Sequence, residues 1–335
     1  MGKNTNFPFG RTAEGIQTLN GSFFPAGAPG NVYFIHPAAA GAFNGQGTAS
    51  DGNIGSIDKP MSTLSGVHSK MTANQNDTAV LIGNSSASAA NVVSEASALT
   101  WSKNLCHIMG TAYNRISHRC SIRPSVKTIA NFITVSASGC VFSNFHVFSD
   151  DDDNEAEIAW TETGQRNAHF NLHIAGMGAT GASNPRDSAG SRHLKLTGDG
   201  ERLFKDCVIG IDTADRGAAN ANLELSSAAV RDIFEDCIFL CQADAATPVF
   251  VNANASGAID RFAYFKKCLF MNGVGSTATS MTEAMTVHAS AGGIIILHDC
   301  QLVGAGDWEN VQSSNVYVEA AQAAATSGRM VASTT

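Results

Sequence analysis

The stretch Phe204-Lys205-Asp206-Cys207-Val208-Ile209 returns three more times along the chain. Its copies are Phe234-Glu235-Asp236-Cys237-Ile238-Phe239, Phe265-Lys266-Lys267-Cys268-Leu269-Phe270 and Leu297-His298-Asp299-Cys300-Gln301-Leu302. The four cysteines follow one another at intervals of 30, 31 and 32 residues. A short apolar unit that recurs every ~20–50 residues is typical of a stacked solenoid. Because each unit alternates apolar and polar residues, it predicts a short strand with one buried face.

Weaker copies extend this repeat toward the N-terminus. In some of them a larger apolar residue replaces the cysteine, so the position requires an apolar side chain rather than a thiol. The intervals between its seven occurrences are 39, 27, 35, 30, 31 and 32 residues. The seven occupants are Cys106, Phe145, Leu172, Cys207, Cys237, Cys268 and Cys300. Strands that form the other faces of the solenoid are predicted at 192–197, 219–225, 248–252, 285–289 and 293–297.

Residues 31–83 predict a cap for one end of the solenoid. Strands are expected at 31–35 and 78–83, and a helix near 60–72, with Asp58 near its N-cap and Pro60 in its first turn. The elements Gly55-Ser56, Lys59-Pro60 and Thr63-Leu64 resemble the N-terminal cap of pectate-lyase-like right-handed β-helix proteins, including those of tailed bacteriophage virions. This resemblance implies a helix that covers the open strand edges of a right-handed parallel β-helix.

The predicted fold class is therefore all-β, a single-stranded right-handed parallel β-helix with a helical cap and extended terminal arms. The solenoid is expected over residues 31–310. An N-terminal arm, 1–30, carries three prolines and four phenylalanines without a period, and a C-terminal arm, 311–335, follows with a last strand at 315–319. We expect the apolar arms to pack on their own solenoid or on a neighbouring subunit.

Composition restricts the classes of partner. The 21 Lys and Arg against 29 Asp and Glu give a net charge of −8, which argues against nucleic-acid binding. No segment resembles a signal peptide or approaches ~18 consecutive apolar residues, so we expect neither secretion nor a membrane partner. The eight cysteines are expected to be reduced core residues of a protein made in a cytoplasm. Cys237 and Cys241 lack the further ligands of a zinc site.

Two groups of carboxylates are candidates for chemistry. The run Asp150-Asp151-Asp152-Asp153 predicts a solvated turn, with a cation site or catalytic acids as alternatives. In the repeat, Asp206, Asp236 and Asp299 each precede the cysteine, and stacking would place the first two about 5 Å apart, a separation that suits a glycan hydrolase. Lys267 replaces the aspartate in the third unit, which favours a solvated ladder over a catalytic pair.

Neither the histidines nor the glycine-rich stretch predicts a site. His107, His146, His173 and His298 lie within or beside the repeat units without metal-binding spacing, so surface or turn positions are expected. Residues 176–181 fit Gly-x-Gly-x-x-Gly, but no amphipathic helix follows them, which excludes a dinucleotide fingerprint. We therefore predict no catalytic, cofactor-binding or metal-binding residues.

The function predicted from these features is that of a bacteriophage virion structural protein, a capsid decoration (cement) protein that stabilises the head. It is not expected to be an enzyme or to need a cofactor. The expected partners are two further copies in a homotrimer and the major capsid protein or other virion proteins, with assembly in the host cytoplasm. The alternatives are a tailspike-like glycan depolymerase or lyase and a receptor-binding tail protein.

Overall fold

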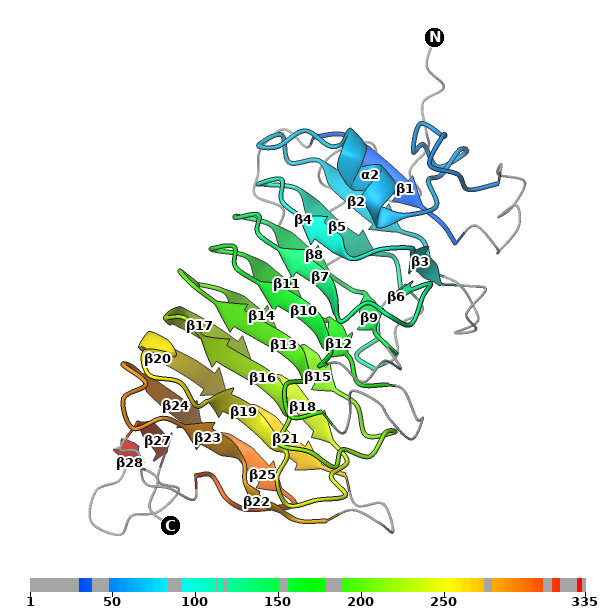
Figure 1. Ribbon diagram of the computed structural model, residues 1–335. Coiled ribbons are helices and arrows are strands. Elements are labelled where there is room, and N and C mark those ends of the chain that lie inside the picture. Colours follow the sequence, from blue (N-terminus) through cyan, green and yellow to red (C-terminus); the bar gives the residue numbers. More distant parts are fainter. Residues whose placement is uncertain are drawn as a thin grey trace.

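The protein is described by a computed structural model over residues 30–37, 48–83, 92–112, 114–116, 120–150, 156–178, 188–273, 279–309, 315–319 and 330–332. Within these residues the strands stack as successive turns of a rod, from the blue N-terminal strands to the orange C-terminal strands (Figure 1). The predicted N-terminal arm and much of the C-terminal arm lie outside the described residues.

Three parallel sheets, which we call A, B and C, run along the rod. Each turn of the chain adds one strand to sheet C, then one to sheet A and then one to sheet B. Sheet A consists of β1 (Val32–Ile35), β2 (Thr78–Leu81), β5 (His107–Gly110), β8 (Val141–Ser143), β11 (Ala168–Phe170), β14 (Leu203–Lys205), β17 (Ala229–Glu235), β20 (Ile259–Lys266), β24 (Ile294–His298), β27 (Val316–Glu319) and β28 (Met330–Ala332). Sheet B consists of β3 (Val93–Glu95), β6 (Ser121–Pro124), β9 (His146–Phe148), β12 (His173–Ala175), β15 (Val208–Gly210), β18 (Ile238–Cys241), β21 (Leu269–Asn272) and β25 (Gln301–Val303). Sheet C consists of β4 (Leu99–Trp101), β7 (Asn131–Val135), β10 (Ile158–Glu162), β13 (Arg192–Thr197), β16 (Ala221–Ser226), β19 (Val249–Ala253) and β23 (Met285–Val287). A separate pair joins β22 (Met281–Glu283) to β26 (Ala305–Asp307).

This arrangement confirms the predicted parallel β-helix. The five strands that we predicted for the other faces correspond to β13, β16, β19, β23 and β24. Among the described strands, β27 and β28 form the one antiparallel pair, at the C-terminal edge of sheet A. The strand predicted at 315–319 is β27, which continues sheet A beyond the last full turn.

The cap helix α2 (Leu64–Lys70) covers the N-terminal end of the rod, as predicted, but it begins later than Asp58 and Pro60 (Figure 1). Its N-cap is Thr63, whose hydroxyl accepts a hydrogen bond from the Gly66 amide at 2.9 Å. The carboxylate of Glu95, on β3, accepts a second one from the Leu64 amide at 2.6 Å. A side-chain oxygen at the N-cap satisfies amides that the first helical turn leaves free, which is why the helix begins here.

The repeat unit is a corner between two strands, not the single strand that its alternation predicts. In the copy at 204–209, Phe204 lies in β14 of sheet A, Asp206 takes a left-handed backbone with φ of 56°, and Val208 begins β15 of sheet B. We call this turn the A–B corner. Its left-handed residues have φ between 51° and 59° and are Asn144, Asn171, Asp206, Asp236, Lys267 and Asp299. Asn and Asp adopt this conformation more readily than other residues with a side chain, which explains their recurrence.

The first member of the cysteine series is also misassigned by the sequence pattern. Cys106 precedes a strand of sheet A, whereas Cys120 precedes β6 of sheet B. Ser121 pairs with His146, so Cys120 occupies the core position that Phe145 fills one turn later. The segment between β5 and β6 is longer than the A–B corners of the later turns, and this insertion hides the correspondence.

Aromatic rings fill the core in a continuous stack. The rings of Phe204 and Phe234 lie 4.9 Å apart, and those of Phe234 and Phe265 lie 4.7 Å apart. All three side chains are fully buried, and burial of one phenylalanine contributes roughly 1.5–3 kcal/mol. The stack repeats at the strand spacing, so it fixes the register of neighbouring turns.

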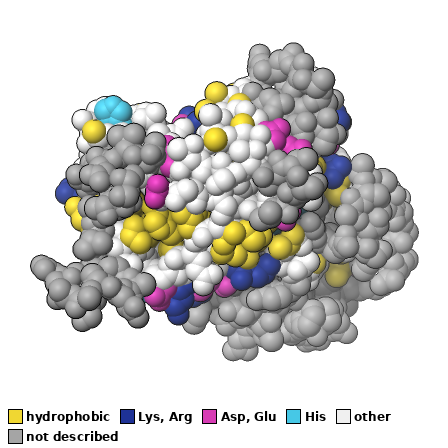
Figure 2. All heavy atoms as spheres, turned by 90° about the horizontal axis from the view of Figure 1, so that it is seen from below, with side chains coloured by type: hydrophobic (Ala, Val, Ile, Leu, Met, Phe, Trp, Pro, Cys, Tyr) yellow, Lys and Arg dark blue, Asp and Glu magenta, His cyan; other side chains and the backbone are white. Residues whose placement is uncertain are grey.

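The cysteines are core residues, as predicted. All eight are free thiols, and only Cys300, in the last turn, is partly exposed. Burial of the core decreases at this end, where Val303 is 42% exposed. Seen from below, groups of hydrophobic side chains reach the surface among polar and charged ones (Figure 2). Among the described helices, none has the length and apolar character needed to span a bilayer.

Candidate functional site

The A–B corner brings the repeated aspartates to the surface in a single row. Asp206 and Asp236 occupy equivalent positions in successive turns, because Lys205 pairs with Glu235 and Val208 pairs with Ile238. One strand spacing, about 4.8 Å, therefore separates their backbones. The side chain of Asp206 is 46% exposed. The structure thus brings together the two aspartates that the sequence suggested as a pair, and it leaves Asp206 open to solvent.

Asp299 does not extend this pair. Lys267 occupies the corner between Asp236 and Asp299, with an exposed side chain. The amides of Asp206 and Asp236 donate hydrogen bonds of 3.0 and 2.9 Å to carbonyls of the next turn. These bonds use the backbone alone, so they leave both carboxylates available for other contacts.

Arg115 is a partner of this pair that the sequence analysis missed. It lies in the long segment between β5 and β6, where later turns use a single left-handed residue. Its Nη2 atom lies 3.6 Å from Oδ1 of Asp206 and donates a hydrogen bond to the carbonyl oxygen of Asp236. The contact joins residues 121 positions apart in sequence, so no local pattern could reveal it. The one available signal is the extra length between Gly110 and Ser121.

A row of charged side chains runs beside the corner on the outer face of sheet A. Glu235 lies between two lysines, 3.3 Å from Lys205 and 3.6 Å from Lys266. Strand register continues the row to His298 and then to Glu319. We call these five residues the charge ladder. Alternating signs at the strand spacing hold the side chains over the sheet and provide repeated hydrogen-bonding groups along its surface.

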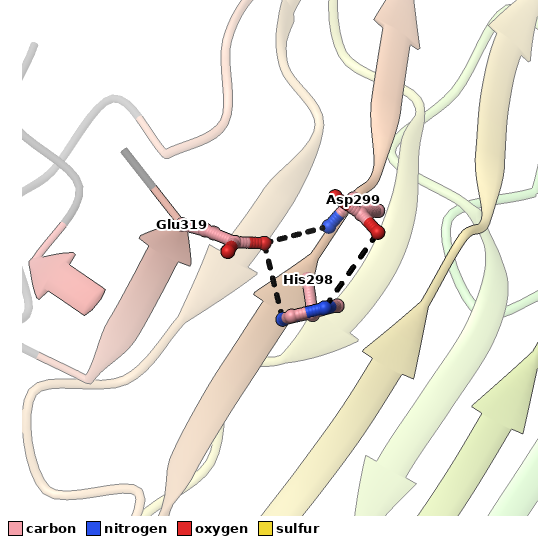
Figure 3. Close-up of side chains that lie close together, drawn as sticks. All are labelled: His298, Asp299 and Glu319. Atoms are coloured by element: carbon pink, nitrogen blue, oxygen red, sulfur yellow. Dashed lines mark hydrogen bonds and ion pairs between the residues drawn. The ribbon is translucent and has the colours of Figure 1, made fainter. Parts of the chain in front are cut away.

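The charge ladder ends in a cluster of three possible metal ligands (Figure 3). His298 Nδ1 lies 3.0 Å from Oε2 of Glu319, and its Nε2 lies 3.6 Å from Oδ2 of Asp299. The amide of Asp299 also donates to Glu319 Oε2 at 3.3 Å. Among the described residues, this is the group of His, Cys, Asp and Glu side chains whose donor atoms could hold one ion.

The other three histidines of the repeat units are buried. The rings of His146 and His173 stack 4.4 Å apart on the covered face of sheet B. His107 accepts a hydrogen bond from the Val141 amide at 3.0 Å, and burial lowers the pKa of His107 to about 4. The prediction of surface or turn positions is therefore wrong for these three, because loops and neighbouring turns cover them.

The remaining two motifs are only partly described by the structure, over residues 176–178 and at Asp150. The amide of Gly176 donates to His193 and that of Met177 donates to Glu157, both inside the protein. These two amides already have partners within the protein, and residues 179–181 of the motif lie outside the described residues. Asp150 is half-buried, and residues 151–155 of the acidic run lie outside the described residues.

A second charged group lies inside the rod. His169 Nε2 is 2.9 Å from Oε2 of Glu162. Arg202 lies 3.7 Å from Glu162 and 3.3 Å from Asp232, and all four side chains are almost fully buried. Asn167 and Trp160 donate further hydrogen bonds to the Glu162 carboxylate at 2.8 and 3.1 Å. Since these side chains are at most 1% exposed, a substrate does not reach the buried network, and we assign it to the fold.

The pKa values of the network follow from its geometry. Burial alone raises the pKa of Glu162, but the charges of His169 and Arg202 outweigh it and leave that pKa below its usual range. Burial also raises the pKa of Asp232, to about 7, although Arg202 acts in the opposite direction. The groups around Glu162 thus offset the desolvation of its carboxylate, whereas those around Asp232 do not.

The fold belongs to a known structural class. Similar solved structures include a rhamnogalacturonan lyase with 11% identity and a TM-score of 0.53, over 82% of this chain and 68% of the lyase. Pectin methylesterase PemA from Erwinia chrysanthemi has 14% identity and a TM-score of 0.53, over 88% of this chain and 89% of that one. The deglycosylated pectin methylesterase from Aspergillus niger has 12% identity and a TM-score of 0.50, over 88% and 83%.

These similarities establish a pectate-lyase-like right-handed parallel β-helix, as the sequence resemblance implied. No protein-family model and no curated protein matches the chain. The prediction that the chain is not an enzyme is contradicted, because the similar structures are a lyase and methylesterases. That prediction relied on missing local motifs, and a β-helix builds its sites across turns. Phage origin, capsid decoration and a homotrimer stay predictions that these structures do not support.

Proposed function

We propose that this protein is a carbohydrate-processing enzyme that cleaves a polysaccharide at the A–B corner. The observation that carries the proposal is the pair Asp206 and Asp236, both half-buried at the surface and one strand spacing apart, with Arg115 brought to it from another part of the chain. Retaining glycosidases need two carboxyl groups about 5–5.5 Å apart. Two aspartates at about 4.8 Å in register provide this separation with small side-chain adjustments.

The chemistry follows from the two carboxyl groups. One carboxylic acid protonates the glycosidic oxygen as the bond breaks, and the other carboxylate attacks the anomeric carbon to form a glycosyl–enzyme bond. A water molecule, deprotonated by the first group, then releases the sugar and restores both residues. Arg115 is a positioning residue in this scheme, since its guanidinium holds the Asp206 carboxylate and the Asp236 backbone in place.

The surroundings suit an extended polymer. The charge ladder runs beside the corner along the rod, so successive sugar units can meet Lys205, Glu235 and Lys266 in turn. Hydrogen bonds to a repeating surface position a chain without enclosing it. The similar structures named above act, by their names, on pectin and rhamnogalacturonan. We therefore expect a polysaccharide rather than a small sugar as substrate.

The test incubates the full chain with a panel of pectic and bacterial cell-surface polysaccharides and measures new reducing ends. Asp206→Asn and Asp236→Asn should each lower the rate at least about 100-fold, because removal of either acid–base or nucleophilic group has this effect. Both substitutions keep the left-handed corner, since Asn144 and Asn171 adopt it elsewhere.

The matched control is Asp260→Asn, an exposed aspartate of β20 outside the corner, which should retain full activity. Unsaturated products would instead indicate elimination by a lyase mechanism at the same corner. Full activity in both corner variants, or no cleavage of any polysaccharide in the panel, would contradict the proposal.

A further inference from the structure

At the end of the charge ladder, the carboxylates of Glu319 and of the adjacent Asp299 share one histidine as their basic partner. Within the ladder, Glu235 contacts two lysines. In the final turn Asp299 and Glu319 both contact His298, and the described part of the chain places no lysine or arginine in ion-pair distance of either. His298 can supply at most one positive charge against two negative ones. The cluster is thus net negative in every protonation state in which both carboxyl groups are ionised.

The backbone places the three possible metal ligands on one surface. Leu297 pairs with Val318, so His298 and Glu319 are neighbours on adjacent parallel strands. Asp299 follows directly, and its left-handed backbone, with φ of 53°, turns the chain at this point. One imidazole nitrogen and two carboxylate oxygens lie within 4.8 Å of one another (Figure 3). Metal bonds of about 2.0–2.2 Å need donors roughly 3–3.5 Å apart, which small side-chain rotations supply.

We propose that His298, Asp299 and Glu319 bind a divalent transition metal of the zinc class. An imidazole with two carboxylates suits such metals, whereas Ca²⁺ requires six to eight oxygen ligands. The side chains are 36%, 56% and 29% exposed, so an ion reaches them directly from solvent. Three protein ligands leave a fourth position open for water or for a group of a bound molecule. The metal supplies the charge that the ladder lacks at this end.

Isothermal titration calorimetry of the chelator-treated full chain with ZnCl₂ alone tests the proposal. We expect one Zn²⁺ per chain, and at least about tenfold weaker binding in His298→Ala and in Glu319→Gln. Asp299→Asn, which keeps the corner conformation, should weaken binding as well. The control is Asp307→Asn on β26, an exposed carboxylate near the same end outside the cluster, and it should bind as the parent does.

Two further measurements separate the site from adventitious binding. Co²⁺ in place of zinc should give visible absorption bands that disappear in His298→Ala, while circular dichroism confirms that each variant is folded. Binding should weaken as the pH falls, because protons compete for the ligands. The proposal is overturned if no stoichiometric binding occurs, if the ligand variants bind as the parent does, or if Ca²⁺ binds as tightly as Zn²⁺. These results are independent of polysaccharide cleavage at Asp206 and Asp236.

Discussion

The molecule holds two groups of acidic and basic side chains in opposite surroundings. The buried network joins Glu162, His169, Arg202 and Asp232 inside the rod, where no charged atom meets solvent. The A–B corner holds Arg115 and Asp206 on the surface, with side chains 42% and 46% exposed. Both groups pair an arginine with an aspartate, but only the second group can contact a large molecule.

This difference separates stability from function. A buried charge must find its partners within the protein, because desolvation costs several kcal/mol per ion. An exposed pair contributes about 0–1 kcal/mol and can exchange its partner for a ligand. Removing one partner of the buried network is therefore expected to cost more stability than removing one at the corner, and the corner is expected to carry recognition and catalysis.

The largest expected effect is on the buried network. Arg202→Met removes the cation between Glu162 and Asp232 and should lower the free energy of unfolding by about 3–5 kcal/mol, because it leaves a buried charge uncompensated. Urea denaturation followed by circular dichroism measures this change. The matched control, Lys205→Met, removes an exposed lysine that lies 3.3 Å from Glu235, and it should cost at most about 1 kcal/mol. Equal losses in the two variants would remove the distinction between the regions.

The free energy of unfolding should depend on pH through Asp232, the buried carboxyl group whose pKa is raised. The pKa of Asp232 is raised to about 7 from a usual value of 3.8. Because the pKa of Asp232 is higher in the folded state, the folded protein keeps this proton to a higher pH than the unfolded chain does. The stability that depends on this proton is fully present below about pH 4. It is lost as the pH rises to about 7, by about 1.4 kcal/mol per pH unit.

Asp232→Asn removes this titration. The difference in unfolding free energy between parent and variant should therefore slope with pH between about 4 and 7 and be flat above that window. Glu162, whose pKa is lowered, has the opposite sign, and it cancels in the difference because both proteins retain it. A difference that is constant from pH 4 to pH 8 would contradict the raised pKa of Asp232.

The sequence predicts the repeated turns well because the apolar positions of the solenoid recur locally. Phe204, Cys207 and their equivalents recur at nearly fixed intervals, and all but the partly exposed Cys300 are buried in the core. The position of the corner was missed, because alternation alone cannot distinguish one strand from two strands joined by a left-handed residue. The recurrent Asn and Asp at that position, including Asn144 and Asn171, indicate a left-handed residue there, because these types adopt that conformation more readily than others.

The sequence revealed the two aspartates of the candidate site but not its arginine. The spacing of the repeat placed Asp206 beside Asp236, since stacking is a local consequence of the period. Arg115, which lies 121 residues before Asp236, reaches both of them through the loop between β5 and β6. The cluster of His298 with Glu319 likewise required the pairing of β24 with β27, which skips the long connection between them.

The smallest expected effect tests whether the corner selects residues through its backbone. Lys267 is exposed and holds φ of 54°, a conformation that costs most residues with a side chain more than it costs Asn. Lys267→Asn should therefore raise the unfolding free energy by about 0.5–1 kcal/mol. The neighbouring Lys266→Asn is the control, because this residue lies in extended β20 and contacts Glu235. That change should lower stability by a similar amount, since Asn is unfavourable in strands. If the unfolding free energy changes in the same direction in both variants, local charge rather than the left-handed backbone determines which residues occupy the corner.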